Sequence, residues 1–182
     1  MADYLEIREL YHYGIKGMRW GVRKDKEILF VSGSSKTQDK SSEYYRKKLP
    51  KDIRKELNSS IKNRDQILVG DAPGIDRQVQ LYLKGKHYTD VIIYGPGKEV
   101  RYNANKKWET RPIDAPEYEP FSKEWLAKKD IAMTNASTKG LAVILDEGAK
   151  ATRNNVQRLI DQNKNVKVYE LSKLGKKHDK YK

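Results

Sequence analysis

The stretch 66–77 constrains the fold of this chain more than any other. The apolar run 67–69 ends at Gly70, a polar loop with a proline and a second glycine follows, and an amphipathic helical pattern then begins. This order predicts a strand, a tight turn and a helix N-terminus. The free N–H groups and the positive dipole end of such a junction suit a phosphate or another anion. An ordinary strand-to-helix connection, with Asp71 as a turn residue, explains the same pattern.

Short apolar runs alternate with helical patterns along most of the chain. We expect strands at 27–35, 67–69, 90–94, 140–145 and 165–169. We expect helices on both sides of Pro50, from Gly74, over 121–136 with Ser122 as its cap, and out of the loop 146–155. The alternation in the last strand is typical of a sheet edge. This order predicts an α/β fold with a doubly wound, mostly parallel, five-stranded Rossmann-like sheet.

Three polar loops follow predicted strands and are expected to gather at one edge of the sheet. Ligands bind at that edge in open α/β sheets. The candidate ligand-binding residues in these loops are Gly33, Ser34, Ser35, Gly70, Asp71, Ala72, Gly74, Asp76, Arg77, Lys150, Thr152, Arg153 and Asn154. Asp71 and Asp76 could hold ribose hydroxyls. The candidate catalytic carboxylates are Asp71, Asp130 and Glu147.

The segment 98–120 shows no clear period and contains three prolines. A connection of this length in a compact domain is usually functional. Arg101, Tyr102, Trp108 and Arg111 could stack on a base or contact a phosphate. We therefore expect a lid over the ligand, with Arg101 as a binding residue; a surface excursion is the alternative.

The composition excludes several classes of protein. With no cysteine among 182 residues there is no disulfide framework and no thiolate zinc site. Three scattered histidines argue against a metal centre, and we expect neither a metal nor a permanent cofactor. No apolar run is long enough to span a bilayer, and no signal peptide is visible. The expected location is the cytosol, or a particle that is assembled in the cytosol.

The net charge of +13 is concentrated at the two ends. Residues 16–26 and 173–182 each contribute +4. We therefore divide the chain into an N-terminal arm (1–26), a nucleotide-binding domain (27–172) and a basic tail (173–182). Such arms favour acidic partners such as nucleic acid, although solubility alone explains the tail.

Aromatic and basic residues interleave with glycines in the arm, at 11–24. That composition suits a recognition peptide that either contacts nucleic acid or docks to a partner. Its expected partner-binding residues are His12, Lys16, Trp20 and Arg23. The segment resembles the short HYGxKGMxWGxR element near the N-termini of many tailed-phage and prophage proteins. This resemblance implies a phage origin and a virion component as partner.

From about residue 28 to 169, the pattern resembles the SLOG superfamily, a Rossmann-like group with DprA-type, LOG-type and TIR-analogue members. Three segments carry the resemblance: Gly70, Asp71, Ala72, Gly74, Asp76 and Arg77; Lys129, Asp130, Ile131, Ala132 and Met133; and Asp146, Lys150, Thr152, Asn154 and Asn155. The resemblance implies a ligand that is a nucleotide or NAD derivative. It also implies pairing of domains, so we expect that the chain can form a homo-oligomer.

Three departures from the family pattern bear on catalysis. Ser35 stands where relatives often have an arginine, and Ala151 stands where the pattern has a glycine. Asn155 occupies the position at which LOG-type enzymes carry a glutamate. Because an amide cannot act as a carboxylate base, phosphoribohydrolase chemistry of the LOG type is in doubt.

The first hypothesis is therefore a phage-encoded binder of an ADP-ribose or NAD-derived nucleotide that sequesters a host immune signal. The second hypothesis is an N-glycosidase acting on the same ligands. The third is a virion structural or cargo protein in which the arm is the working part.

Overall fold

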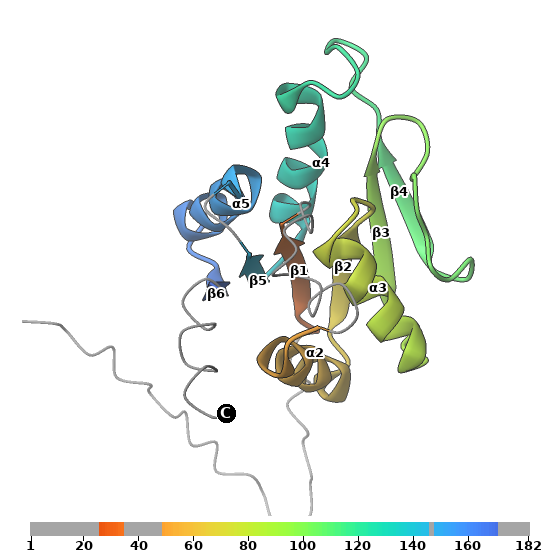
Figure 1. Cartoon of the computed structure of the whole chain (residues 1–182), viewed down its shortest axis with the longest axis vertical. Coiled ribbons are helices and arrows are strands. Elements are labelled where there is room, and N and C mark those ends of the chain that lie inside the picture. Colours follow the sequence, from red (N-terminus) through yellow and green to blue (C-terminus); the bar gives the residue numbers. More distant parts are fainter. Residues whose placement is uncertain (1–25, 35–48, 146–147, 171–182) are drawn as a thin grey trace, which may run out of the picture.

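A sheet in which all paired strands are parallel organises the residues that the computed structural model describes, which are 26–34, 49–145 and 148–170 (Figure 1). Its strands are β1 (Ile28–Gly33), β2 (Gln66–Gly70), β3 (Val91–Pro96), β4 (Glu109–Ile113), β5 (Lys139–Ile144) and β6 (Asn165–Glu170). The helices are α2 (Lys51–Asn63), α3 (Ile75–Gly85), α4 (Lys123–Ala136) and α5 (Lys150–Asp161). The α/β class is confirmed, with six strands instead of the five predicted.

The spatial order of the strands, β4-β3-β2-β1-β5-β6, differs from their order in the chain. From β1 the chain moves outward through β2 and β3 to β4, and it then crosses back to place β5 on the other side of β1. Leu29 of β1 consequently pairs with Lys139 of β5 and with Ile67 of β2. The direction of winding thus reverses between β1 and β5.

Side chains of the central strands alternate between two cores. In β1, Leu29 and Val31 face the core formed with α2 and α3, whereas Phe30 faces the core formed with α4 and α5. Both sides are apolar because helices cover both faces, which explains the nearly continuous apolar runs in the sequence. Met133 of α4 and Leu159 of α5 complete the second core.

The segment 98–120 differs from its prediction as an irregular lid. It contains β4, an edge strand that pairs with β3. Pro112, which lacks a backbone N–H donor, is compatible with an edge position. The connection from β3 to β4 contains no helix; it packs Val100, Ala104 and the buried Trp108 against the core on the α3 face. Trp108 donates a hydrogen bond from Nε1 to the carbonyl of Tyr88 (2.9 Å), so it is not placed to stack on a ligand.

Other local predictions are confirmed. The Ser122 hydroxyl caps α4 by accepting a hydrogen bond from the backbone of Trp125 (3.1 Å). β6 lies at the sheet edge, as its alternation indicated. The helix expected before Pro50 falls mainly on 35–48, outside the described residues, as do the arm to residue 25 and the tail from 171.

Replacing Gly33 with alanine should destabilise the fold. A Cβ at Gly33 would meet Cγ2 and Cβ of the buried Ile75 at 2.3 and 2.4 Å, where β1 ends against the start of α3. Overpacking of this kind costs about 1–3 kcal/mol. Urea unfolding should show this loss. Gly85→Ala is the matched control because nothing lies within 4 Å of its Cβ position; equal losses in both variants would contradict the packing argument.

Candidate functional site

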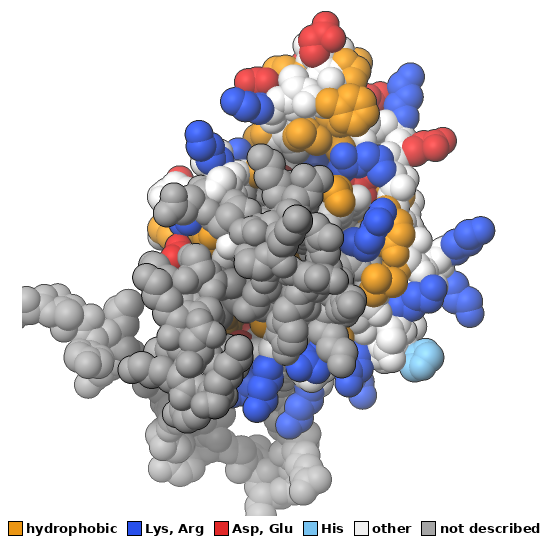
Figure 2. Space-filling view, in the orientation of Figure 1, with side chains coloured by type: hydrophobic (Ala, Val, Ile, Leu, Met, Phe, Trp, Pro, Cys, Tyr) orange, Lys and Arg blue, Asp and Glu red, His pale blue; other side chains and the backbone are white. Residues whose placement is uncertain are grey.

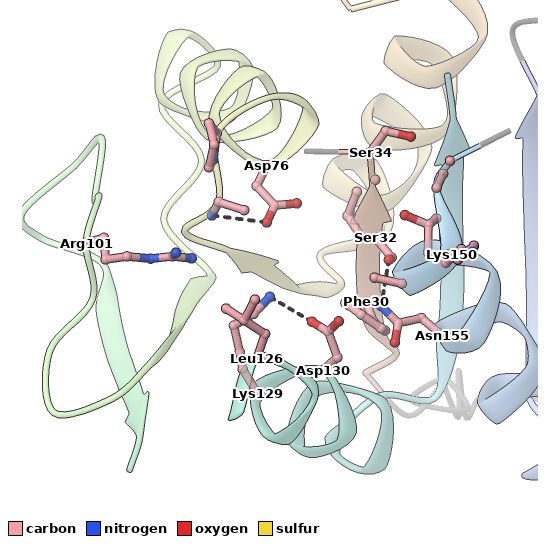
Figure 3. Close-up of a pocket in the computed structure, with 18 residues that line it drawn as sticks. Phe30, Ser32, Ser34, Asp76, Arg101, Leu126, Lys129, Asp130, Lys150 and Asn155 are labelled. Carbon is pink, nitrogen blue, oxygen red and sulfur yellow. Dashed lines mark hydrogen bonds and ion pairs between the residues drawn. The ribbon is translucent and has the colours of Figure 1, made fainter. Parts of the chain in front are cut away.

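A cavity of about 300 Å³ opens at the carboxyl end of β1 (Figure 3). Its walls come from the end of β1, the loop after β2, the start of α3, the middle of α4 and the first turn of α5, with Arg101 reaching in from the β3–β4 connection. This is the point at which the strand order reverses between β1 and β5. Open α/β sheets bind ligands at such switch points.

The wall formed by α5 is suited to an anion. The helix begins after Ala149, whose side chain offers no cap to the first backbone N–H groups. Lys150 and Thr152 of the first turn line the cavity. Thr152 is only 3% exposed, and its hydroxyl has no hydrogen-bond partner among the described residues. A ligand oxygen could therefore bind this hydroxyl and the adjacent amides together.

The floor of the cavity is fastened by polar contacts at the end of β1. Asn155 of α5 donates from Nδ2 to the hydroxyl of Ser32 (2.9 Å), and both side chains are buried. The Ser34 hydroxyl accepts a hydrogen bond from the backbone of Leu145 (3.1 Å). These serine oxygens accept bonds within the protein, which leaves their hydroxyl protons for a ligand.

The opposite wall carries a group of charges from α3 and α4, of which Asp76 and Lys129 are buried and Asp130 is half-buried. Lys129 and Asp130 form an ion pair of 2.7 Å, and both line the cavity together with Asp76 (Figure 3). Gly70 makes room for this group, because a Cβ there would lie 2.2 Å from Oδ2 of Asp76 and 2.8 Å from Nζ of Lys129. Asp76 also accepts a long hydrogen bond of 3.3 Å from the backbone of Ala72.

Burial and neighbouring charges together set the pKa values of Asp76 and Lys129 in this wall. Burial raises the pKa of Asp76 from 3.8 to about 7, against the opposing charge of Lys129. Burial disfavours the ammonium of Lys129, but the carboxylates of Asp130, Asp76 and Asp71 outweigh it and raise the pKa of Lys129. Lys129 therefore stays charged at neutral pH, while burial shifts Asp76 toward its protonated form.

Asp71 lies beside the cavity and is bound to Arg101. Its side chain is fully buried, with Oδ1 accepting from Nη2 of Arg101 (2.5 Å) and Oδ2 accepting from Nε (3.0 Å). Oδ2 also accepts from the backbone N–H of Arg101 (2.7 Å). These hydrogen bonds raise the pKa of Arg101. The Arg101 side chain lines the cavity, whereas Asp71 does not.

The structure gathers about half of the predicted ligand residues around the cavity. Those that line it are Gly33, Ser34, Ala72, Asp76, Arg101, Lys150 and Thr152, and the predicted catalytic Asp130 joins them. Those that do not line it are Gly70, Asp71, Gly74, Arg77, Arg153 and Asn154. Those outside the described residues are Ser35, Glu147 and the arm residues His12, Lys16, Trp20 and Arg23.

Three of the residues that do not line the cavity have a backbone role or a side-chain partner elsewhere. Gly74 precedes α3 with φ of 90°, a conformation that favours glycine. Arg77 is exposed and stacks on the ring of Tyr102 at 4.3 Å. Arg153 pairs with Glu170 of β6 (3.0 Å).

Sequence reasoning gave no site role to several lining residues. Lys129 and Asn155 stood in segments that resemble the family, but neither was assigned a role. Phe30 and Leu126 also line the cavity, and an apolar residue in an apolar pattern gives no signal of this. Figure 2 shows a row of basic side chains over α2. These side chains lie outside the two arms, to which the sequence pattern assigned most of the net positive charge.

The described residues lack the features of two other kinds of site. No group of three or more histidine, aspartate or glutamate residues in this part of the chain could hold a metal ion. Within the same ranges, the helices are too short or too polar to cross a membrane.

Comparison with known protein families finds a similarity in the N-terminal arm. Residues 3–27 match a family described as "Family of unknown function (DUF7211)". The matched segment contains the aromatic and basic element of the arm and ends just before β1. A search of curated proteins found no match. The cavity thus lies wholly outside the segment matched to a family.

The buried Asp76 should make stability depend on pH. Its pKa is about 7 in the folded chain against an ordinary value of 3.8, so the folded state holds a proton that the unfolded state releases between these values. The free energy of unfolding therefore falls as pH rises from about 4 to 7, by at most about 1.4 kcal/mol per pH unit. Asp76→Asn removes this dependence, so its stability relative to wild type should rise between pH 5 and 8.

Urea unfolding at several pH values measures this difference. Asp52→Asn, at an exposed position on α2, is the control and should keep a constant offset from wild type over the same range. A constant offset for Asp76→Asn as well would show that Asp76 does not hold the extra proton.

Proposed function

We propose that this chain binds a small nucleotide of the ADP-ribose or NAD-derived class in the cavity at the β1–β5 switch. The observation that carries the proposal is the cavity wall formed by the start of α5, which has no side-chain cap. It presents the side chain of Lys150 and the hydroxyl of Thr152, which has no hydrogen-bond partner among the described residues. We read the sheet as Rossmann-like, since its ligand cavity lies where that fold places phosphates.

The two sides of the cavity match the two chemical parts of a ribose phosphate. The α5 side offers N–H donors and a positive charge to phosphate oxygens. The α3–α4 side offers the carboxylates of Asp76 and Asp130, which accept hydrogen bonds from sugar hydroxyls. A volume of about 300 Å³ is at the lower end for small-molecule sites, and it suits one such unit.

The biological role follows from the two sequence resemblances. We propose that a phage encodes the chain and that it sequesters a nucleotide that a host uses as an immune signal. The arm, whose residues 3–27 match a family of unknown function, would dock to a virion component. The third hypothesis, a virion cargo protein, rests on the same arm; deleting residues 1–24 should then abolish particle association and leave nucleotide binding intact.

Ligand capture tests the proposed function. The full chain is mixed with NAD, ADP-ribose, cyclic ADP-ribose, AMP and cyclic dinucleotides, filtered and heat-denatured, and the released compounds are separated by chromatography. We expect one adenine nucleotide to be retained and released intact. The double variant Lys150→Ala/Thr152→Val should bind it about tenfold to a hundredfold more weakly, because a charge and a hydrogen bond to phosphate are lost.

Lys62→Ala is the matched control for a lost surface lysine, since Lys62 is exposed on α2 away from the cavity. It should bind like wild type. Wild-type affinity in the double variant would place the ligand elsewhere, and no retained compound in any mixture would reject the proposed function.

A second candidate function is hydrolysis of the N-glycosidic bond of the same ligand. It is favoured by Asp76, whose pKa of about 7 suits an acid–base group at neutral pH, facing the same cavity as Asp130. Protonated Asp76 would give its proton to the leaving base, Asp130 would stabilise the positive sugar, and water would add its hydroxide to C1′ and return its proton to Asp76. Asp71, the other described carboxylate predicted to act, is engaged by Arg101 outside the cavity.

Release of free base from the retained nucleotide measures this activity. If it occurs, Asp76→Asn and Asp130→Asn should each lower its rate by at least about a hundredfold. Asp161→Asn, at an exposed site on α5, is the control. Full turnover in both cavity variants would reject these assignments, and a ligand that is always released intact would leave binding as the function.

A further inference from the structure

Within the described part of the chain, every hydrogen bond to the Asp71 carboxylate comes from Arg101. One oxygen accepts from Nη2, and the other accepts from both Nε and the backbone N–H. The Asp71 side chain is fully buried, so a ligand in the cavity does not reach it. Asp71 is therefore a partner of Arg101 and not, as the sequence suggested, a direct contact for ribose.

Arg101 keeps donors that Asp71 does not use. A guanidinium has five N–H groups in a fixed plane, and Asp71 takes one from Nε and one from Nη2. The Arg101 side chain is 36% exposed and reaches the cavity from the side opposite α5 (Figure 3). Three N–H groups thus remain on a guanidinium whose plane is set by the carboxylate behind it.

Close packing and hydrogen bonds of the surrounding backbone hold the Asp71–Arg101 pair beside the cavity. Gly95 leaves space for it, because a Cβ there would lie 2.7 Å from Oδ2 of Asp71 and 2.8 Å from Cα of Val100. Gln80 holds the next part of the same connection, accepting from the N–H of Ala104 (2.9 Å) and donating to the carbonyl of Gly70 (2.8 Å). Gln80 does not line the cavity. Of the Asp71 and Gln80 contacts to this connection, only the Asp71 contact involves a side chain that lines the cavity, that of Arg101.

We propose that Arg101 binds an acceptor oxygen of the nucleotide and that Asp71 is the positioning residue that aims its guanidinium. The proposal rests on the proposed nucleotide-binding function and adds to it a recognition element on the wall opposite the phosphate-binding start of α5. Because Asp71 balances the charge of Arg101, the pair supplies direction more than net charge. It therefore suits a ligand oxygen held in a fixed position, such as a sugar or second phosphate oxygen.

A double-mutant cycle with ADP-ribose as the probe tests this inference. Arg101→Gln should weaken binding by about tenfold to a hundredfold, the range for a lost hydrogen bond to a charged group. Asp71→Asn should weaken it by a smaller factor, since an amide presents one donor where the guanidinium needs two acceptors. The double variant should bind like Arg101→Gln alone, because a positioning residue has no effect once its target is absent.

Gln80→Ala separates positioning from loosening of the connection. It removes the neighbouring attachment and should lower the melting temperature without a comparable loss of ADP-ribose affinity. Arg101→Lys keeps the charge without the planar fork, and it should bind nearly as weakly as Arg101→Gln. This variant tests the inference even if Asp71→Asn does not fold.

Three results would overturn the inference while leaving the proposed function intact. They are wild-type affinity in Arg101→Gln or Arg101→Lys, additive losses in the cycle, and a loss in Gln80→Ala equal to that in Asp71→Asn. Failure of the wild-type chain to bind any nucleotide would reject the proposed function, and this inference with it.

Discussion

The pairing of β1 on both sides is the constraint on which the rest of the structure depends. β1 is hydrogen-bonded to β2 on one side and to β5 on the other, and the chain winds away from it in opposite directions. The two halves consequently place their helices on opposite faces, and the connections diverge at the carboxyl end of β1. The cavity opens at that divergence, so it follows from topology before any particular side chain is considered.

The side chains then give the cavity two unlike walls. On the α3–α4 side, Arg101 is balanced by Asp71 and Lys129 by Asp130, which is how buried charges are tolerated. Asp76 shares Lys129 with Asp130, and burial dominates its proton affinity. The first turn of α5, on the other side, presents donors and a positive charge. A ligand that is anionic at one end and rich in hydroxyls at the other matches both walls.

The sequence was sufficient to predict those strands whose burial leaves an apolar pattern in it. The apolar runs located β1, β2, β3 and β5, and an alternating pattern located the more exposed β6. The glycine-bearing junction at 66–77 marked the start of α3 and one wall of the cavity. β4 was missed because every one of its residues is exposed or half-buried and it contains Pro112, so it carries no apolar pattern. The pairing of Asp71 with Arg101 was not predicted for another reason: a carboxylate in a loop looks the same whether it meets a ligand or an arginine thirty positions further along.

The position of β5 has a consequence for how the chain folds during synthesis. Leu29 of β1 pairs with Lys139 of β5. The strand that pairs with one side of β1 is therefore synthesised only after most of the chain has been made. During that interval β1 is an edge strand with an apolar sequence, the kind of edge that folded proteins protect against association. The cavity is also absent until then, because α5 has not yet been placed. A nucleotide would therefore bind only the completed fold, and by mass action it would stabilise the last step of assembly.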